Sequence, residues 1–146
     1  MKILVSACLL GCCCRYDSKS KADERVLALG KYHTLIPVCP EQLGGMPTPR
    51  VPSERVGDRV VSREGLDVTH HFQKGAEEAF RIGQLLCCDG ALLKERSPSC
   101  GNGTIYDGSF SGGLKPGDGV FAELLKNNGI PVYGETDIPA LLDINH

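Results

Sequence analysis

The chain has 146 residues, of which 41% are hydrophobic and 23% charged, and its net charge is −2 at pH 7. A chain of this length and composition forms one hydrophobic core, which excludes wholesale disorder. Because the net charge is slightly negative, non-specific nucleic-acid binding is not expected, and no polymeric nucleic acid is predicted among the partners.

In the first half of the chain, two strands alternate with a helix. Residues 2–7 form a near-continuous aliphatic run, which is typical of a strand covered on both faces in a parallel sheet. An amphipathic pattern over residues 19–29 predicts a helix, and residues 34–38 predict a second buried strand. Gly and Pro then break residues 43–52 into a loop, and residues 59–65 predict a small hairpin.

The second half continues the alternation. Residues 69–86 carry the strongest amphipathic pattern and predict a long helix, and residues 90–94 predict a third buried strand. Residues 101–119 hold seven glycines and predict a hairpin or a series of turns. A last helix is predicted over residues 119–127 and a last strand over residues 130–133.

This alternation predicts an α/β fold, in which right-handed crossovers connect parallel strands. We expect a small three-layer, Rossmann-like domain with a mostly parallel sheet. The 18 glycines and 9 prolines place much of the remaining chain in loops. No repeat, linker or low-complexity segment divides the chain, so residues 1–146 are predicted to be a single domain.

The eight cysteines are interpreted as reduced thiols. Five of them stand in contiguous groups, at residues 12–14 and 87–88, and adjacent cysteines rarely bridge each other. The N-terminal run resembles a short lipoprotein signal, but it lies at the short limit and is interrupted by Ser6 and Cys8. No stretch approaches the length of a transmembrane helix. We therefore expect a cytoplasmic protein without a membrane partner.

Three cysteines follow predicted strands. Cys8, Cys39 and Cys100 come after the first, second and third strands respectively. In open parallel sheets, ligands bind outside the carboxyl ends of the strands, so these thiols are expected to converge on one edge. A role as small hydrophobic core residues is the alternative for any one of them.

Three soft ligands predict zinc or an iron–sulfur cluster with one open iron, and the spacing does not separate the two. Cys14 is the candidate for a fourth ligand. The remaining cysteines are not expected to bind metal: Cys12, Cys13, Cys87 and Cys88.

The chain resembles a known family over nearly its whole length. The motifs that carry the resemblance are VSACLLG at 5–11, CRYD at 14–17, PVCPE at 37–41, GG and PTPR at 44–50, LKERSPSCG at 93–101, GTIYDG at 103–108 and PGDGV at 116–120. They are similar to those of the DUF523 family, whose characterised members are thiouracil desulfidases. In those enzymes a [4Fe–4S] cluster held by three cysteines serves to remove sulfur from thiolated uracil bases or nucleotides. Cys12 and Cys13 depart from the residues that relatives usually carry.

The resemblance implies a [4Fe–4S] cluster on Cys8, Cys39 and Cys100, with Glu41 and Ser97 as catalytic residues. Glu41 would act as general base or proton shuttle when water attacks the thiocarbonyl carbon. Without the resemblance, Glu41 is equally well read as a loop carboxylate that caps a helix, and Ser97 as a turn residue before a proline.

Further residues are candidates for substrate binding. Lys94 and Arg96 stand close to the third cysteine, Cys100, and Arg50 lies in the proline loop. Their positive charges would offset thiolates or hold a substrate phosphate. Gly117 and Gly119 precede the last predicted helix, whose N-terminus favours an anion. A surface role for each cation and a plain turn for the glycines are the alternatives.

The leading hypothesis is therefore a non-redox desulfidase acting on a small thiolated pyrimidine such as thiouracil or 4-thio-UMP. A zinc- or cluster-stabilised small-ligand binding module without catalysis is the second hypothesis. A thiol redox sensor that uses the cysteines at residues 12–14 is the third. The sequence does not specify an oligomeric state.

Overall fold

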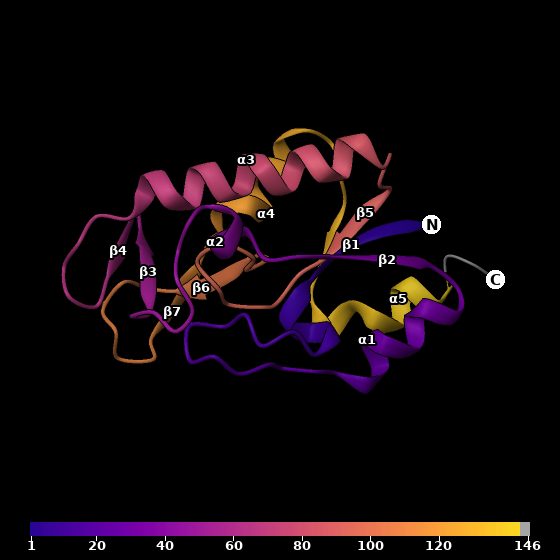
Figure 1. The fold of residues 1–146 in the computed structure, drawn as a ribbon, viewed down its shortest axis with the longest axis horizontal. Helices are drawn as coiled ribbons and strands as arrows, with labels where there is room; N and C mark the ends of the chain where they lie inside the picture. The colour runs from indigo at the N-terminus through magenta and orange to yellow at the C-terminus, as the bar shows by residue number, and fades with distance from the viewer. Residues whose placement is uncertain (144–146) are drawn as a thin grey trace.

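The computed structural model describes residues 1–143, and its centre is a four-stranded parallel sheet (Figure 1). The strands of this sheet follow the order β2-β1-β5-β8 and have these bounds: β1 Lys2–Ser6, β2 Thr34–Val38, β5 Gly90–Leu92 and β8 Val132–Tyr133. Each of the four predicted apolar runs contains one of these strands. The predicted α/β fold with a parallel sheet is confirmed.

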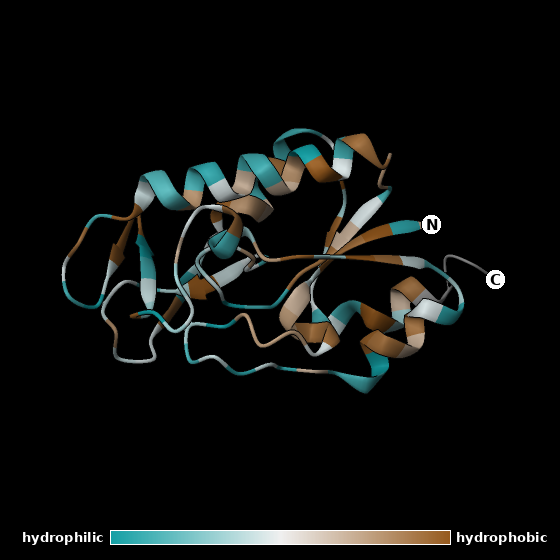
Figure 2. Cartoon of the chain, viewed as in Figure 1, coloured by the Kyte–Doolittle hydropathy of each residue, from teal (hydrophilic) through white to brown (hydrophobic). Residues whose placement is uncertain are grey.

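Helices cover both faces of the sheet, which gives the three predicted layers (Figure 1). On one face α3 (Thr69–Leu85) and α4 (Val120–Asn127) pack against the sheet, and on the other lie α1 (Glu24–Ala28) and α5 (Ile138–Asp143). Alternate side chains of β1 serve the two layers: Leu4 packs with the α3 and α4 side, while Ile3 and Val5 pack with the α1 and α5 side. Figure 2 shows hydrophobic residues concentrated along the central strands.

The first helix is shorter than predicted. Helix α1 begins only after Asp23, whose side chain accepts a hydrogen bond from the Arg25 backbone N–H at 2.9 Å and caps the helix. The predicted residues 19–23 are therefore not helical. Helices α3 and α4 match their predicted spans to within one residue at each end.

Two hairpins lie beyond the carboxyl ends of β1 and β2, at the left of Figure 1. Strands β6 (Thr104–Tyr106) and β7 (Leu114–Pro116) form the hairpin predicted in the Gly-rich segment. The other hairpin pairs β3 (Ser53–Val56) with β4 (Arg59–Ser62). Its tight turn falls at Gly57 (φ 61°), and β3 was not predicted. The chain also turns back after β4, as predicted for residues 59–65: the Gly65 N–H donates to the Ser62 carbonyl oxygen, and Val61 forms an antiparallel bridge with Asp67.

A four-residue helix, α2 (Pro40–Leu43), follows β2 directly. It packs against the N-terminal half of α3, where Gly44 and Gly75 allow the two backbones to approach closely. Within residues 1–143, no helix is both long and apolar enough to span a bilayer.

Candidate active site

Cys8, Cys39 and Cys100 lie past the carboxyl ends of neighbouring strands. Cys8 is in the 3₁₀ turn that follows β1, and Cys39 stands directly before α2 at the end of β2. Because Ser6 pairs with Val38 in the parallel register, β1 and β2 end at the same edge of the sheet, and the two cysteines that follow them lie there. Cys100 follows β5, which pairs with the other side of β1. The topology therefore brings three segments that are distant in sequence to one edge.

Cys14 joins these thiols. Gly11, with φ 102°, ends the 3₁₀ turn in the left-handed region and redirects the chain, and Cys14 is then buried. Its thiol is close enough to those of Cys39 and Cys8 for both to influence its pKa. The Cys39 thiol also contacts the Cys14 carbonyl oxygen at 3.8 Å. The contacts of Cys14 therefore place it among the predicted ligands.

One cavity of about 330 Å³ connects the thiols with charged and polar side chains. All four thiols line it: Cys8, Cys14, Cys39 and Cys100. Its walls also include Glu41, Arg50, Glu54, Lys94, Ser97, Ser99 and Phe110. Its volume is at the lower end of the range for small-molecule sites, about 300–1,000 Å³.

Burial contributes to raised pKa values at three of these thiols, Cys14, Cys39 and Cys100. It raises the pKa of Cys100 to about 12, against the lowering effect of hydrogen bonds from Ser6 and Ser99. For Cys14, the hydrogen bond with Cys39 lowers the pKa, but the bond with Cys8, burial and the neighbouring thiols together raise it to about 11. The hydrogen bond with Cys14 and burial also raise the pKa of Cys39. A bound metal reverses this effect, because thiols coordinate as thiolates.

The Ser-Pro-Ser-Cys segment folds into a turn around the Ser97 hydroxyl. Its oxygen accepts hydrogen bonds from the backbone N–H groups of Ser99, at 3.1 Å, and Cys100, at 3.0 Å. The Gly101 N–H donates to the Ser97 carbonyl oxygen at 2.9 Å. Such side-chain to backbone bonds are the reason serine favours turns, and here they fix the backbone of Cys100.

Gly119 supports the same turn from the start of α4. A Cβ atom at this position would lie 2.4 Å from the carbonyl carbon of Ser99 and 2.6 Å from the Cys100 nitrogen. The Phe121 N–H donates to the Ser99 carbonyl oxygen at 2.8 Å. Helix α4 therefore packs directly on the backbone of the cysteine turn, and this contact requires glycine.

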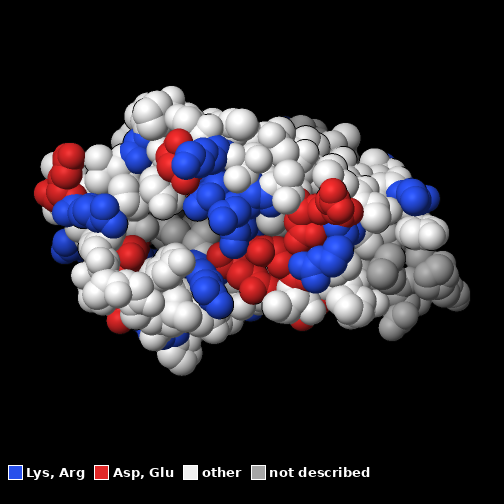
Figure 3. Space-filling model, turned by 90° about the horizontal axis from the view of Figure 1, so that it is seen from below, with Lys and Arg blue, Asp and Glu red and all other residues white. Residues whose placement is uncertain are grey.

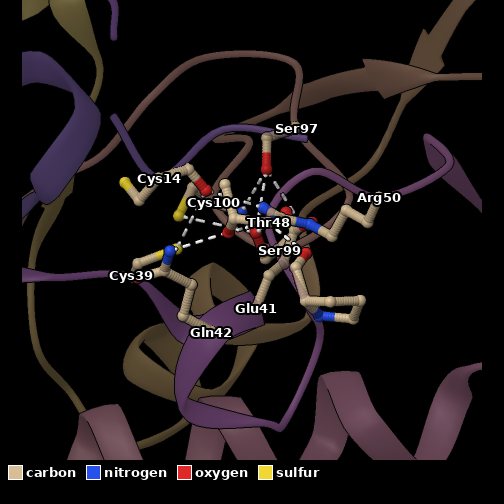
Figure 4. A network of polar contacts seen from close by, with 10 residues as sticks. Cys14, Cys39, Glu41, Gln42, Thr48, Arg50, Ser97, Ser99 and Cys100 are labelled. Atoms are coloured by element: carbon tan, nitrogen blue, oxygen red, sulfur yellow. Dashed lines mark hydrogen bonds and ion pairs between the residues drawn. The ribbon is translucent and has the colours of Figure 1, made fainter. Parts of the chain in front are cut away.

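Glu41, Ser99 and Arg50 form a polar network beside the thiols (Figure 4). The Arg50 Nε donates to Glu41 Oε1 at 3.1 Å, and the Ser99 hydroxyl donates to Glu41 Oε2 at 2.9 Å. The Ser97 and Ser99 hydroxyl oxygens are 2.9 Å apart, and Ser99 Oγ lies 3.7 Å from the sulfur of Cys100. A hydrogen-bonded chain thus extends from a carboxylate to two hydroxyls next to a thiol.

The Arg50 side chain is buried and hydrogen-bonded within the protein. Its side chain is only 4% exposed. Nη1 donates to Thr48 Oγ1 at 3.0 Å and to the Pro47 carbonyl at 3.1 Å, and Nη2 donates to the Cys14 carbonyl at 3.0 Å. With its bond to Glu41, the guanidinium joins the proline loop, the carboxylate and the Cys14 loop in one arrangement.

The other predicted substrate-binding residues are placed differently from one another. Lys94 lines the cavity and pairs with Glu135 at 3.3 Å. Arg96 lies outside the cavity lining and borders a separate hollow, and Gly117 and Gly119 are also outside the lining. Of the five predicted substrate-binding residues, Lys94 and Arg50 therefore line the cavity together with the thiols. The other three do not line it: Arg96, Gly117 and Gly119.

The cysteines predicted not to bind metal lie outside the cavity lining: Cys12, Cys13, Cys87 and Cys88. The first three are exposed and Cys88 is half-buried. All eight cysteines of the chain are free thiols.

Two residues of the site were not identified from the sequence. Ser99 contacts Glu41 directly, and its only sequence signal was its position next to a predicted ligand. Glu54 lines the cavity from β3, a strand that the sequence pattern does not predict. The sequence around Ser99 is that of an ordinary turn, and the sequence around Glu54 does not differ from that of an ordinary strand or loop, so neither marks a residue of the site.

The chain is similar to known proteins over nearly its whole length. The family model described as 2-thiouracil desulfurase matches residues 3–137. The chain is 39% identical to the uncharacterized protein YbbK of Bacillus subtilis (strain 168), over 96% of this chain and 99% of that protein. It is 48% identical to a solved structure described as the [4Fe-4S]-dependent thiouracil desulfidase TudS (DUF523Vcz), with a TM-score of 0.91, covering 97% of this chain and 95% of that one.

Proposed function

The chain belongs to the 2-thiouracil desulfurase family, and from this premise we propose that it is a [4Fe–4S]-dependent desulfidase that releases sulfide from thiouracil. Its substrate is a small thiolated pyrimidine, either the base or a nucleotide such as 4-thio-UMP. The observation that carries the proposal is one cavity lined by Cys8, Cys39 and Cys100 together with Glu41.

The donor set of the cavity fits an iron–sulfur cluster. Thiolates are the protein ligands of such clusters and select soft metals. Four thiols line the cavity, and no histidine stands among the described residues that line it. We assign Cys8, Cys39 and Cys100 as the ligands, which leaves Cys14 as a neighbouring thiol. When bound, the cluster supplies a Lewis acid for the thiocarbonyl sulfur.

Cys14 is also the residue that a zinc site would need as a fourth ligand, and it contacts Cys8 and Cys39. Within residues 1–143, however, no group of three or more His, Cys, Asp or Glu side chains is arranged to hold a single metal ion. Membership of the desulfurase family and the likeness to TudS favour the cluster over zinc and over a redox sensor.

In the proposed reaction, water replaces the sulfur on the ring carbon, and thiouracil becomes uracil with release of hydrogen sulfide. Glu41 accepts one proton of the attacking water, while its Oε1 stays bonded to Arg50, which holds the carboxylate in place. The other water proton leaves the oxygen on the ring carbon as the C–S bond breaks, so both protons of the water end on the released hydrogen sulfide. The Ser99 hydroxyl, bonded to Glu41 Oε2, passes the proton toward the departing sulfur. Ser97 holds the cysteine turn and is in contact with Ser99 as a second hydroxyl of the relay.

A substitution of the carboxylate tests this assignment. Glu41→Gln should keep the fold and the cluster, because the amide oxygen still accepts from Arg50 while the side chain no longer takes a proton. Sulfide release under anaerobic conditions should fall by about two to four orders of magnitude. The matched control is Glu77→Gln on the exposed face of α3, which should release sulfide at the parental rate. Unchanged release by Glu41→Gln with full iron content would exclude Glu41 as the base.

The two serines can be separated in the same assay. Ser99→Ala removes the hydroxyl that donates to Glu41 but leaves the backbone hydrogen bonds of the cysteine turn in place, so the rate should fall while iron content stays. Ser97→Ala removes the acceptor of two backbone N–H groups in the cysteine turn, so iron retention should fall as well. Equal iron content and equal rates in the two variants would contradict these roles.

We also propose that residues 1–146 act as one domain in the cytoplasm. One sheet organises both hydrophobic clusters of the described residues, which supports a single domain. Eight free cysteines and an iron–sulfur cluster are suited to a reducing compartment.

A further inference from the structure

Glu54 is a buried acidic residue in the wall of the substrate cavity, and the mechanism above does not use it. It is the second residue of β3 and is 9% exposed. Its Oε1 accepts hydrogen bonds from the backbone N–H groups of Gly108, at 2.9 Å, and Phe110, at 3.1 Å. No other described residue forms a hydrogen bond or ion pair with Glu54, so its second oxygen, Oε2, has no partner within residues 1–143.

The loop that Oε1 holds is itself part of the cavity wall. Phe110 lines the cavity and has φ 56°, a region that bulky residues rarely adopt. Such a conformation persists only where neighbouring contacts hold it, and the two bonds to Glu54 are such contacts. Arg63 places its guanidinium 5.9 Å from the centre of the Phe110 ring. One oxygen of Glu54 therefore fixes an aromatic wall, while the other is left for a ligand.

Within residues 1–143, Ser53 Oγ is the one buried side-chain oxygen or nitrogen without a partner, so Glu54 Oε2 is reached by solvent in the cavity. A ligand that displaces this water must replace its hydrogen bond, because a carboxylate oxygen buried without a partner is costly. A ligand that brings an N–H donor into the cavity would satisfy the second oxygen. Uracil rings carry such a donor at N3, between the two carbons that bear sulfur in 2-thiouracil and 4-thiouracil, and N3–H remains when N1 bears a ribose. In cytosine rings the same nitrogen is an acceptor. Enzymes that act on bases read these edges by hydrogen bonds.

We propose, on the basis of the function proposed above, that Glu54 is a specificity-determining residue: its Oε2 accepts a hydrogen bond from the N3–H of the thiouracil ring, while its Oε1 positions Phe110. The acceptor selects uracil-type over cytosine-type rings. Figure 3 shows Lys and Arg side chains gathered on the face seen from below, next to Asp and Glu. The cavity lining likewise combines both signs, with Arg50, Lys94 and Arg63 beside Glu41 and Glu54.

Glu54→Gln gives a directional test. The two backbone donors at Gly108 and Phe110 require an acceptor, so the glutamine amide oxygen should take the place of Oε1 and its NH₂ should take the place of Oε2. The variant then donates where the parent accepts. The kcat/KM ratio for 2-thiouracil over 2-thiocytosine, two rings with the same sulfur position, should fall by about 10- to 100-fold. The matched control is Glu64→Gln, an exposed position in the loop after β4, which should leave the ratio unchanged.

A binding measurement that needs no turnover separates this proposal from the function on which it rests. Calorimetry on the cluster-loaded protein should show tighter binding of uracil than of cytosine, and Glu54→Gln should reduce that preference. Absence of sulfide release with the binding preference intact would refute the desulfidase and keep the role of Glu54. Equal binding of uracil and cytosine by the parent protein, or an unchanged preference in a folded Glu54→Gln, would overturn the role of Glu54.

Discussion

Gly75, on α3, meets the backbone of α2 with no side chain between them. A Cβ atom added at Gly75 would lie 1.8 Å from the Pro40 carbonyl oxygen, and one added at Gly44 would lie 1.9 Å from that of His71. Helix α2 carries Glu41 and follows Cys39 directly. This close contact therefore sets the position of the proposed base and of one proposed ligand, and Gly75→Ala tests it.

The expected effect follows from two opposing terms. Alanine stabilises a helix by about 1 kcal/mol relative to glycine. Because real Cβ atoms do not come within 3.0 Å of other atoms, α2 must retreat by roughly 1.2 Å or more. Overpacking of this kind costs up to about 3 kcal/mol, so Gly75→Ala should lower the free energy of unfolding by about 2 kcal/mol. A shift of about 1 Å in Glu41 should lower the rate of sulfide release by about 10²-fold.

Gly83→Ala is the matched control, since it lies in the same helix and is also buried. Its Cβ would lie 2.8 Å from Leu4 Cδ1, the end of a side chain that can rotate, so the unfolding free energy should change by less than about 1 kcal/mol. Urea unfolding and anaerobic sulfide release measure the two effects. Equal stability of the two variants, with a parental rate in Gly75→Ala, would refute the reasoning.

Two further predictions concern the thiols. Replacing Cys12, Cys13, Cys87 and Cys88 together with serine should leave the iron content intact, since none lines the cavity, and iron loss from the folded variant would mean that the ligand set is wrong. In cluster-free protein, the pKa is raised to about 11 for Cys14 and to about 12 for Cys100, from the ordinary thiol pKa of 9.0. Above pH 9, the folded state therefore keeps thiol protons that the unfolded chain releases. Stability should therefore be fully present below about pH 9 and fall as the pH rises toward 12, and urea unfolding that shows constant or rising stability in that window would contradict the burial of these thiols.

The sequence predicted the location of residues that follow a buried strand. Buried parallel strands read as aliphatic runs, so the ends of β1, β2 and β5, and with them Cys8, Cys39 and Cys100, were placed from the sequence. The site depends on longer-range contacts as well. The position of Cys14 depends on the left-handed conformation of Gly11. The orientation of the Arg50 guanidinium depends on its hydrogen bonds to carbonyl groups in two loops.

Residues in irregular segments were harder to assign. Ser97 and Ser99 flank the same proline, yet only Ser99 bonds Glu41, because the turn directs the Ser97 hydroxyl to backbone N–H groups. Glu54 was not recognised because β3 follows a proline-rich loop and lacks an alternating pattern. Gly119 was interpreted as part of an anion-binding helix start, whereas the structure packs it against the backbone of Cys100.

The central claim is that the three thiols hold a cluster that serves desulfuration, and one measurement on anaerobically purified protein tests it most directly. Iron and acid-labile sulfide should be found at about four each per chain, and the same sample should release sulfide from 2-thiouracil. Cys100→Ser should lose both the cluster and the activity, because an alcohol is a poor ligand for soft metals. One zinc per chain, or a complete cluster without sulfide release from thiouracil or its nucleotide, would contradict the account.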